Sequence, residues 1–301
     1  MPELPEVETI VKDLNKRLTH EIFRDAWTDY PKFIKTGSFA KFKKEIKNLK
    51  FESAVRRGKN ILIFLKPPKS TARKILLIHP KMTGHLLLGK WKMTKSDGKA
   101  KPKSLLLGPI SDKINDYVHL IFYLNSGNML ALSDVRKFAK VVLGDEKKIR
   151  KSKHLSNIGP EPLEKNFTAK LLKNILSREK RKIKQTLMDP RVIAGIGNIY
   201  SDEILWSAKI HPFTKSNSLD LREIKAIYVA TKNTLSRAVK MRGTSFSDFR
   251  DLSGRRGKFG DSRRVYKRNG EMCLRCSSVI ERVKIGGRSA HFCPRCQKIN
   301  K

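Results

Sequence analysis

The first residues of the chain carry chemistry with specific requirements. The sequence opens MPELPEVET, and a proline in second position allows Met1 to be removed, which leaves the secondary amine of Pro2 at the N-terminus. Such an amine is a nucleophile, and its attack on an aldehyde-like carbon gives an iminium ion that acts as an electron sink. Glu3 can protonate a departing oxygen if burial or the neighbouring Glu6 keeps it protonated. The same residues also suit the first turn of a helix, and local chemistry alone favours that simpler interpretation.

Four cysteines near the C-terminus form two closely spaced pairs. Cys273 and Cys276 stand in CLRC, Cys293 and Cys296 stand in CPRC, and sixteen residues separate the pairs. Two such pairs complete the tetrahedral thiolate shell that zinc prefers at a structural site. The spacing therefore predicts one structural zinc ion.

Glycines mark two further candidate anion sites. Gly286 and Gly287 lie between two strand-like segments, which predicts a two-residue hairpin turn with Arg288 at its tip, where it can contact phosphate. Gly195 and Gly197 precede Asn198 at an expected helix start, where unpaired amides can hold an anion. Taken alone, the second pattern is more typical of a structural elbow.

Charge and composition limit the class of protein. The 301 residues include 66 Lys and Arg against 28 Asp and Glu, a net charge of +38. Because the basic residues run along the whole length, nucleic acid is the expected partner. The apolar runs are far shorter than the ~20 residues that a transmembrane helix needs, and the N-terminus lacks a secretory pattern, so we expect no membrane association. We expect a cytoplasmic, nucleoid-associated protein with reduced thiols.

The apolar pattern changes along the chain. Helical spacing from Val7 to Leu18 gives way at about 21 to 143 to short apolar runs that predict antiparallel strands buried on both faces. The charged segment 144–154 is the expected linker. Helical patterns follow, with Thr168 as a predicted cap, a short helix from Ile183 to Met188, and a longer helix from about Leu219 to Arg242.

Six blocks in order make the chain similar to the formamidopyrimidine-DNA glycosylase family. They are PELPEVET, RRGKNI at 56–61, HPKMTG at 79–84, IGPEPL at 158–163, LMDPRVIAGIGNIYSDE at 187–203, and CLRC with CPRC. The resemblance implies a multidomain α+β fold: an antiparallel β-sandwich flanked by helices, then a helix-two-turn-helix domain with a four-cysteine zinc-finger β-hairpin. We place the catalytic domain at 1–147, the linker at 148–158, the helical domain at 159–262 and the hairpin at 263–301.

The resemblance also implies an activity: a monomeric glycosylase and AP lyase of base excision repair. Such an enzyme flips an oxidised purine, 8-oxoguanine or a formamidopyrimidine, out of double-stranded DNA, removes it, and nicks the backbone by β- then δ-elimination. Pro2 would form the Schiff base, Glu3 would donate a proton in base removal, and Lys59 and Arg288 would donate protons in the two eliminations. The expected DNA-binding residues, several of which grip phosphates or fill the void left by the base, are His79, Met82, Asn115, Arg136, Phe138 and Asn198.

Several positions depart from the family pattern. The usual DPRRFG is DVRKFA here, so Val135, Lys137 and Ala139 differ, while the Arg136 that faces the orphaned base is kept. Asn115 replaces a frequent His and Glu179 a frequent Lys. The base-recognition loop is GRRGKFG at 254–260, which leaves lesion preference open. The alternatives are a same-fold glycosylase that prefers oxidised pyrimidines, and a non-catalytic zinc-ribbon nucleic-acid-binding protein.

Overall fold

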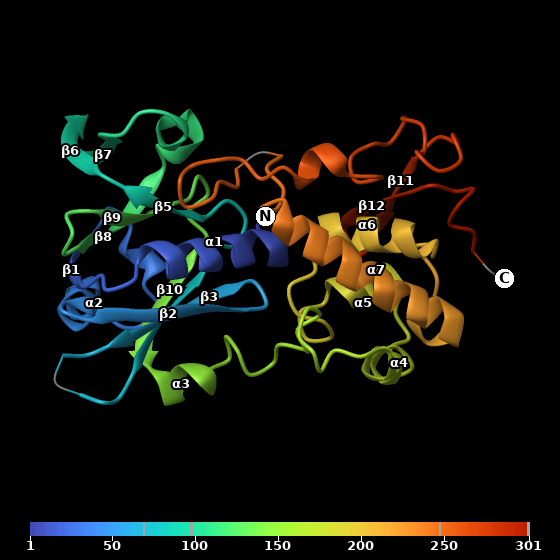
Figure 1. The fold of residues 1–301 in the computed structure, drawn as a ribbon, viewed down its shortest axis with the longest axis horizontal. Helices are drawn as coiled ribbons and strands as arrows, with labels where there is room; N and C mark the ends of the chain where they lie inside the picture. The colour runs from blue at the N-terminus through green and yellow to red at the C-terminus, as the bar shows by residue number, and fades with distance from the viewer. Residues whose placement is uncertain (69, 97–98, 247, 300–301) are drawn as a thin grey trace. The chain divides into compact units, whose positions relative to one another are not determined.

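The chain forms two compact units in the computed structural model, which describes residues 1–299 except 69, 97, 98 and 247 (Figure 1). The first unit contains residues 1–156 together with 241–258, and the second contains 157–240 and 259–299 of the described chain. The predicted fold class, an antiparallel sandwich followed by a helical part and a C-terminal hairpin, is confirmed. The chain therefore passes from one unit to the other three times.

Two four-stranded antiparallel sheets build the first unit (Figure 1). Their inward side chains form one hydrophobic cluster, which includes Phe23, Ile63, Leu76 and Phe122. One sheet has the order β1 (Phe23–Thr28), β8 (Val118–Leu124), β9 (Met129–Ser133) and β5 (His85–Gly89). The other has the order β10 (Lys140–Asp145), β4 (Lys74–His79), β3 (Asn60–Lys66) and β2 (Lys50–Arg57).

The outer faces of both sheets are also covered, as the apolar pattern predicts. Ile121 of β8 and Leu87 of β5 face a separate cluster that contains Trp91 and Ile110. Trp91 begins β6 (Trp91–Ser96), which pairs with β7 (Lys99–Ser104). On the other sheet, the guanidinium groups of Arg73 and Arg150 lie 5.3 and 5.5 Å from the ring centre of Phe64. Runs such as VHLIFYL are apolar at both parities because both faces are buried.

Among the described residues, three α-helices belong to the first unit. The N-terminal helix α1 (Leu4–Arg17) packs on β2 and β3, as its apolar face predicts. Helix α2 (Phe39–Ile46) lies in a region where the sequence predicts only strands. The segment expected to be a linker contains α3 (Glu146–Arg150), whose Ile149 is buried and whose Glu146 pairs with Arg73 at 2.9 Å.

The second unit is mainly helical. It contains α4 (Ala169–Leu176), α5 (Ile183–Met188), α6 (Asn198–Ala208), α7 (Leu221–Lys240) and the hairpin of β11 (Glu281–Ile285) and β12 (Arg288–Phe292). The Thr168 hydroxyl accepts the Leu171 N–H at 3.1 Å, which confirms the predicted cap. Short 3-10 helices occur in both units. They are Pro31–Phe33, Pro109–Ser111 and Lys113–Asn115 in the first unit, and Ser216–Ser218 and Phe259–Ser262 in the second. No described helix is both long and apolar enough to cross a membrane.

Candidate active site

The N-terminal residues are buried and held by a carboxylate three residues downstream. Pro2 is buried and Glu3, the N-cap of α1, is 2% exposed. The Glu6 carboxylate accepts the Glu3 N–H at 2.8 Å and the Thr244 N–H at 2.6 Å. A Cβ on Gly243 would lie 2.5 Å from a Glu6 oxygen, and this glycine has a φ of +75°. The Glu3 side chain in turn accepts the backbone N–H of Glu6, so the two residues form a capping box that holds the start of α1.

The turn that carries Lys59 is fixed to the first turns of α1. Gly58 opens the two-residue turn between β2 and β3 with a φ of +59°, a conformation that favours glycine. Arg56 donates to the Gly58 carbonyl at 3.1 Å and to the Glu8 carboxylate of α1 at 2.9 Å. This ion pair holds the Lys59 turn against the helix that begins beside Pro2 and Glu3.

His79 sits at the end of β4 among cations. Its pKa is lowered to about 3 by burial and by the charges of Lys81, Lys59 and Lys140. Its Nδ1 accepts the Lys81 N–H at 3.0 Å, so the neutral ring carries its proton on Nε2 and can donate it to an anion. Lys140, which pairs with His79 across the β10–β4 ladder, was not among the residues predicted from the sequence. A basic residue at the start of a strand does not indicate, from the sequence alone, which residues lie beside it in the sheet.

The depressed pKa of His79 predicts a loss of stability in acid. The unfolded chain binds a proton at this histidine near pH 6.5 and the folded chain only near pH 3. The free energy of unfolding should therefore fall as the pH drops from 6.5 towards 4, by at most about 1.4 kcal/mol per pH unit from this group. Urea denaturation at several pH values should show a shallower decline for His79→Gln. A gap between the two proteins that is constant with pH would contradict this.

The predicted void-filling residues lie on two loops that one buried carboxylate holds together. Arg136 and Phe138 are exposed, and the Arg136 guanidinium lies 4.6 Å from the centre of the Phe138 ring. Asp134 is 0% exposed. It accepts the Thr83 hydroxyl, the Arg136 N–H at 3.3 Å and the Ala139 N–H at 2.8 Å. Thr83 follows Met82, which is half-buried, so Asp134 sets the position of all three predicted residues.

Replacing Asp134 by Ala should loosen both loops. Each buried N–H left without a partner costs about 1–3 kcal/mol. We expect weaker excision of a damaged base from duplex DNA, which needs the void-filling residues, and a smaller effect on a single-stranded abasic site, which leaves no void. Parallel rates on the two substrates measure this, with Thr83→Ser as the matched control. Equal losses on both substrates would argue against a positioning role.

Asn115 has an internal role. Its side chain is 2% exposed, its amide oxygen lies 2.9 Å from the Nε2 of His85, and its NH₂ donates to the Pro109 carbonyl at 2.9 Å. Through these bonds the Asn115 amide holds the loop around Pro109 and Ile110, which covers the outer face of the sheet that contains β5. The DNA contact of Asn115 stays a prediction.

Two predicted anion-binding residues lie in the second unit. Gly286 and Gly287 form the predicted hairpin turn with φ values of +53° and +74°, and Arg288 opens β12 with an exposed side chain. Asn198 is the first residue of α6, as predicted. Its Oδ1 is buried and has no hydrogen-bond partner within the part of the chain that the structure describes. This oxygen accepts hydrogen bonds and so calls for a donor such as water, whereas the Asn198 NH₂ is the group that can donate to an anion.

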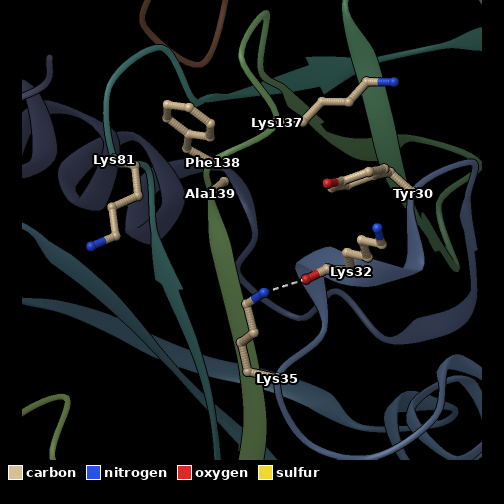
Figure 2. A pocket seen from close by; sticks show the side chains of 7 residues that line it. All are labelled: Tyr30, Lys32, Lys35, Lys81, Lys137, Phe138 and Ala139. Carbon is tan, nitrogen blue, oxygen red and sulfur yellow. Dashed lines mark hydrogen bonds between the residues drawn. The ribbon is translucent and has the colours of Figure 1, made fainter.

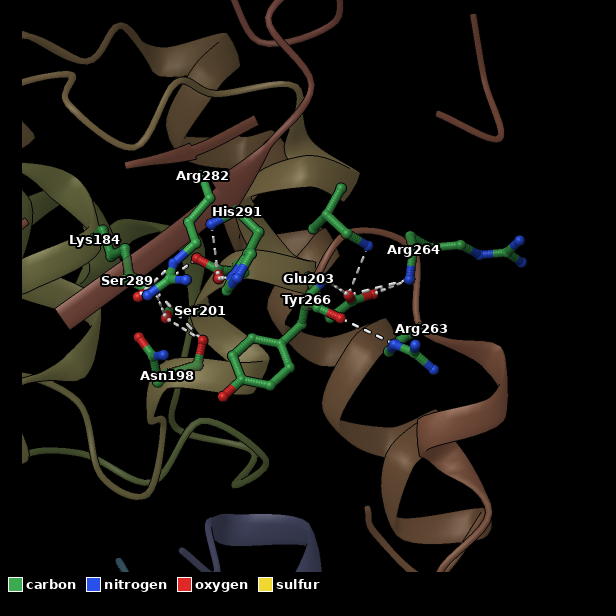
Figure 3. A network of polar contacts seen from close by, with 12 residues as sticks. Lys184, Asn198, Ser201, Glu203, Arg263, Arg264, Tyr266, Arg282, Ser289 and His291 are labelled. Carbon is green, nitrogen blue, oxygen red and sulfur yellow. Dashed lines mark hydrogen bonds and ion pairs between the residues drawn. The ribbon is translucent and has the colours of Figure 1, made fainter. Parts of the chain in front are cut away.

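Two adjacent acids of α6 hold two later parts of the second unit, residues 264–266 and strand β12 (Figure 3). Asp202 accepts from the Lys184 ammonium at 2.5 Å and from the N–H and Nδ1 of His291 in β12 at 3.0 and 2.9 Å. Glu203 accepts three consecutive backbone N–H groups, from residues 264–266. Burial nevertheless raises the pKa of Glu203. Neither acid was predicted to have a role. Two adjacent acids in a largely apolar helix could have indicated that they bind other parts of the protein.

The four cysteines converge in the second unit. Their sulfur atoms all lie within 4.8 Å of one another, and two of the separations are 3.4 Å. Sulfurs around a tetrahedral zinc, with bonds of about 2.3 Å, would be about 3.8 Å apart. The Trp206 indole N–H lies 3.5 Å from the Cys273 sulfur, a neighbour that suits a thiolate. The donor set therefore fits a closed, structural four-thiolate metal site.

Three family models together match almost the whole chain. The formamidopyrimidine-DNA glycosylase N-terminal domain matches residues 1–141. The formamidopyrimidine-DNA glycosylase H2TH domain matches residues 158–250. A zinc finger found in FPG and IleRS matches residues 270–299, which include all four cysteines.

Individual proteins match over their full lengths. A formamidopyrimidine-DNA glycosylase of Bacillus cereus is 34% identical over 298 residues, which are 99% of both chains. A complex of Lactococcus lactis Fpg with DNA containing an abasic site superposes with a TM-score of 0.84 at 31% identity, over 99% of this chain and 100% of that one. A complex of MutM with DNA containing carbocyclic 8-oxo-G gives 0.83 at 30% identity and the same coverage.

Proposed function

This chain belongs to the formamidopyrimidine-DNA glycosylase family, and we propose that it excises oxidised purines from double-stranded DNA through a Schiff base at Pro2. It is a DNA glycosylase of base excision repair, and the lyase step is consistent with the family. The observation that carries the Schiff-base proposal is the N-terminus itself. Pro2 and Glu3 are buried at the start of α1, and Glu6 accepts the Glu3 N–H, so the proposed acid directly follows the proposed nucleophile on backbone that is held in place.

The proposed reaction uses the residues in sequence. After removal of Met1, the Pro2 nitrogen attacks the sugar carbon that bears the damaged base, and the bond to the base breaks. The bond from that carbon to the ring oxygen then breaks as the Glu3 carboxyl gives its proton to the oxygen, which leaves an open-chain iminium ion. Loss of a C2′ proton, whose electrons the iminium ion accepts, expels the 3′ phosphate, and loss of a C4′ proton from the conjugated product expels the 5′ phosphate. Lys59 and Arg288 act as proton donors in these two eliminations. Neutral His79 and the Asn198 amide hold phosphates beside the lesion.

We propose a single structural zinc ion at Cys273, Cys276, Cys293 and Cys296, and a monomeric enzyme. The zinc proposal rests on the geometry of the four sulfurs and on the zinc-finger match. The ion would hold the β11–β12 hairpin, which carries Arg288 at its tip, and it would take no part in bond breaking because thiolates would fill all four of its positions.

Borohydride trapping tests the proposed chemistry. Duplex DNA containing 8-oxoguanine, incubated with the full-length enzyme and borohydride, should give a covalent adduct that is stable to denaturation. Pro2→Gly, which replaces the secondary amine by a primary one, should reduce the adduct strongly. The absence of an adduct with the wild-type chain, or an undiminished adduct with Pro2→Gly, would contradict the proposal.

Lesion preference has a second candidate because the loop at 254–260 departs from the family pattern. Asp251 holds the start of this loop: it accepts the N–H groups of Ser253 and Arg255, both at 2.9 Å, and also pairs with Arg242 at 2.7 Å. We favour oxidised purines because the PELPEVET opening and the set of Met82, Arg136 and Phe138 match that branch. Excision rates across matched duplexes with 8-oxoguanine and an oxidised pyrimidine decide between the two.

A further inference from the structure

A hollow in the first unit is lined by lysines that the proposed reaction does not use. It has a volume of about 410 Å³ and is bounded by Tyr30, Lys32, Lys35, Lys81, Lys137, Phe138 and Ala139 (Figure 2). None of its lining residues is acidic. None of the four lysines takes part in an ion pair within the described residues. The nearby Asp29 is paired with His119 at 2.9 Å.

The cations are held in place by the backbone and by an aromatic ring. Lys81 and Lys137 have φ values of +59° and +54°, a conformation that non-glycine residues seldom adopt and that clusters at functional sites. The Lys137 ammonium lies 5.2 Å from the centre of the Tyr30 ring. The Lys35 ammonium donates to the Lys32 carbonyl at 2.5 Å (Figure 2). Unneutralised cations around one hollow repel each other, and an anion between them would remove that repulsion.

Phe138 divides the basic residues of this region into two groups. In Figure 2 its ring lies between Lys81 on one side and Lys137, Tyr30 and Lys32 on the other. Lys81 is next to His79, which the proposed function places on the phosphates of the damaged strand. A wedge that enters a duplex has the two strands on its two sides. The lysines beyond Phe138 are therefore placed for the other strand.

We propose that the side of the hollow lined by Tyr30, Lys32, Lys35 and Lys137, beyond Phe138 from Lys81, binds the phosphate backbone of the DNA strand opposite the lesion. This inference rests on the proposed function, because it takes Phe138 as the wedge and Arg136 as the residue that faces the orphaned base. It assigns the four residues a task distinct from the chemistry: they hold the undamaged strand while the other strand is opened.

The test compares strands as well as variants. We would measure binding against salt concentration for the wild type, for Lys32→Gln with Lys35→Gln, and for Lys137→Asn, since Asn tolerates a positive φ. The DNAs are a duplex with a stable abasic-site analogue, its lesion strand alone, and a duplex with uncharged methylphosphonates opposite the lesion. Lys44→Gln with Lys47→Gln is the control, because both lysines are exposed and neither lines the hollow.

The proposal predicts a loss that depends on the strand. For the normal duplex, the log–log salt slope of the hollow variants should be smaller by about 0.9 for each phosphate that the variant no longer neutralises. The wild type and the variants should bind the single strand equally, and likewise the methylphosphonate duplex. Equal losses on single strand and duplex, or an equal loss in the control, would overturn the proposal. Borohydride trapping of the same proteins separates this outcome from a failure of the proposed function, because trapping depends on Pro2 and not on these lysines.

Discussion

A Glu3→Gln variant is expected to lose excision of 8-oxoguanine by a factor of about 10²–10⁴, the usual contribution of a positioned general acid. The variant should still form a borohydride-trapped adduct on DNA that already contains an abasic site, because the base has then left and the Pro2 amine needs only the sugar aldehyde. Glutamine has the shape of glutamate, and Glu6 still accepts the backbone N–H of residue 3. Single-turnover excision rates and trapping yields on the two substrates measure the effect.

The control for this variant is Glu45→Gln. Glu45 pairs with Lys74 at 3.1 Å at the surface and takes no part in the proposed chemistry, so both of its activities should be unchanged. If Glu3→Gln loses activity equally on both substrates, Glu3 acts by holding the N-terminus rather than by giving a proton. The buried position of Glu3 is compatible with both roles, and the experiment separates them.

Removal of the metal from the full-length protein should unfold the C-terminal hairpin. Small four-thiolate modules take their folding free energy from zinc, with apparent values of about 10–16 kcal/mol in zinc-finger peptides. With a chelator, or in Cys296→Ser, the backbone amides of β11 and β12 should lose protection from hydrogen exchange, and strand nicking should fall with the loss of a placed Arg288. Amides of β3 and β4, in the other unit, should keep their protection.

Two further measurements make this result specific. Added zinc should restore both protection and nicking after removal of the chelator, and should restore neither in Cys296→Ser. Leu274→Ala serves as the matched control, because Leu274 lies between two of the cysteines, is 58% exposed and offers no metal ligand. A hairpin that keeps its protection without metal would show that the contacts of Asp202 and Glu203 are enough to hold the module.

Features set by short-range spacing could be predicted from the sequence. The paired cysteines meet, Arg288 directly follows the Gly286–Gly287 turn, and the short helix has the predicted bounds at Ile183 and Met188. In each case the residues that decide the structure are close in sequence. Helix α2 was missed because it is only eight residues long and lies among strand-like runs, although Phe39, Phe42 and Ile46 repeat at helical spacing and Ser38 caps it.

Groups that act across long sequence separations could not be predicted. Asp134 joins loops 51 residues apart, Glu203 accepts N–H groups 61 to 63 residues away, and Glu6 binds Thr244 across 238 residues. A carboxylate that serves backbone N–H groups needs no particular partner side chain, so no pair of residue types in the sequence indicates the contact. The bonds of Asn115 to His85 and the Pro109 carbonyl were likewise not predicted, because its assignment to DNA came from the position it shares with a frequent His of the family.

The return of residues 241–258 to the first unit has a consequence for the order of events during synthesis. The N-terminus leaves the ribosome long before Gly243 and Thr244 are made, so Glu6 at first lacks one of the two groups that it binds in the finished protein. Phe249 and Leu252, which belong to the core of the first unit, also arrive late. Under the proposed function, the aminopeptidase that removes Met1 therefore meets a nascent chain whose end is still loosely held. Maturation of the nucleophile precedes completion of the fold that encloses it.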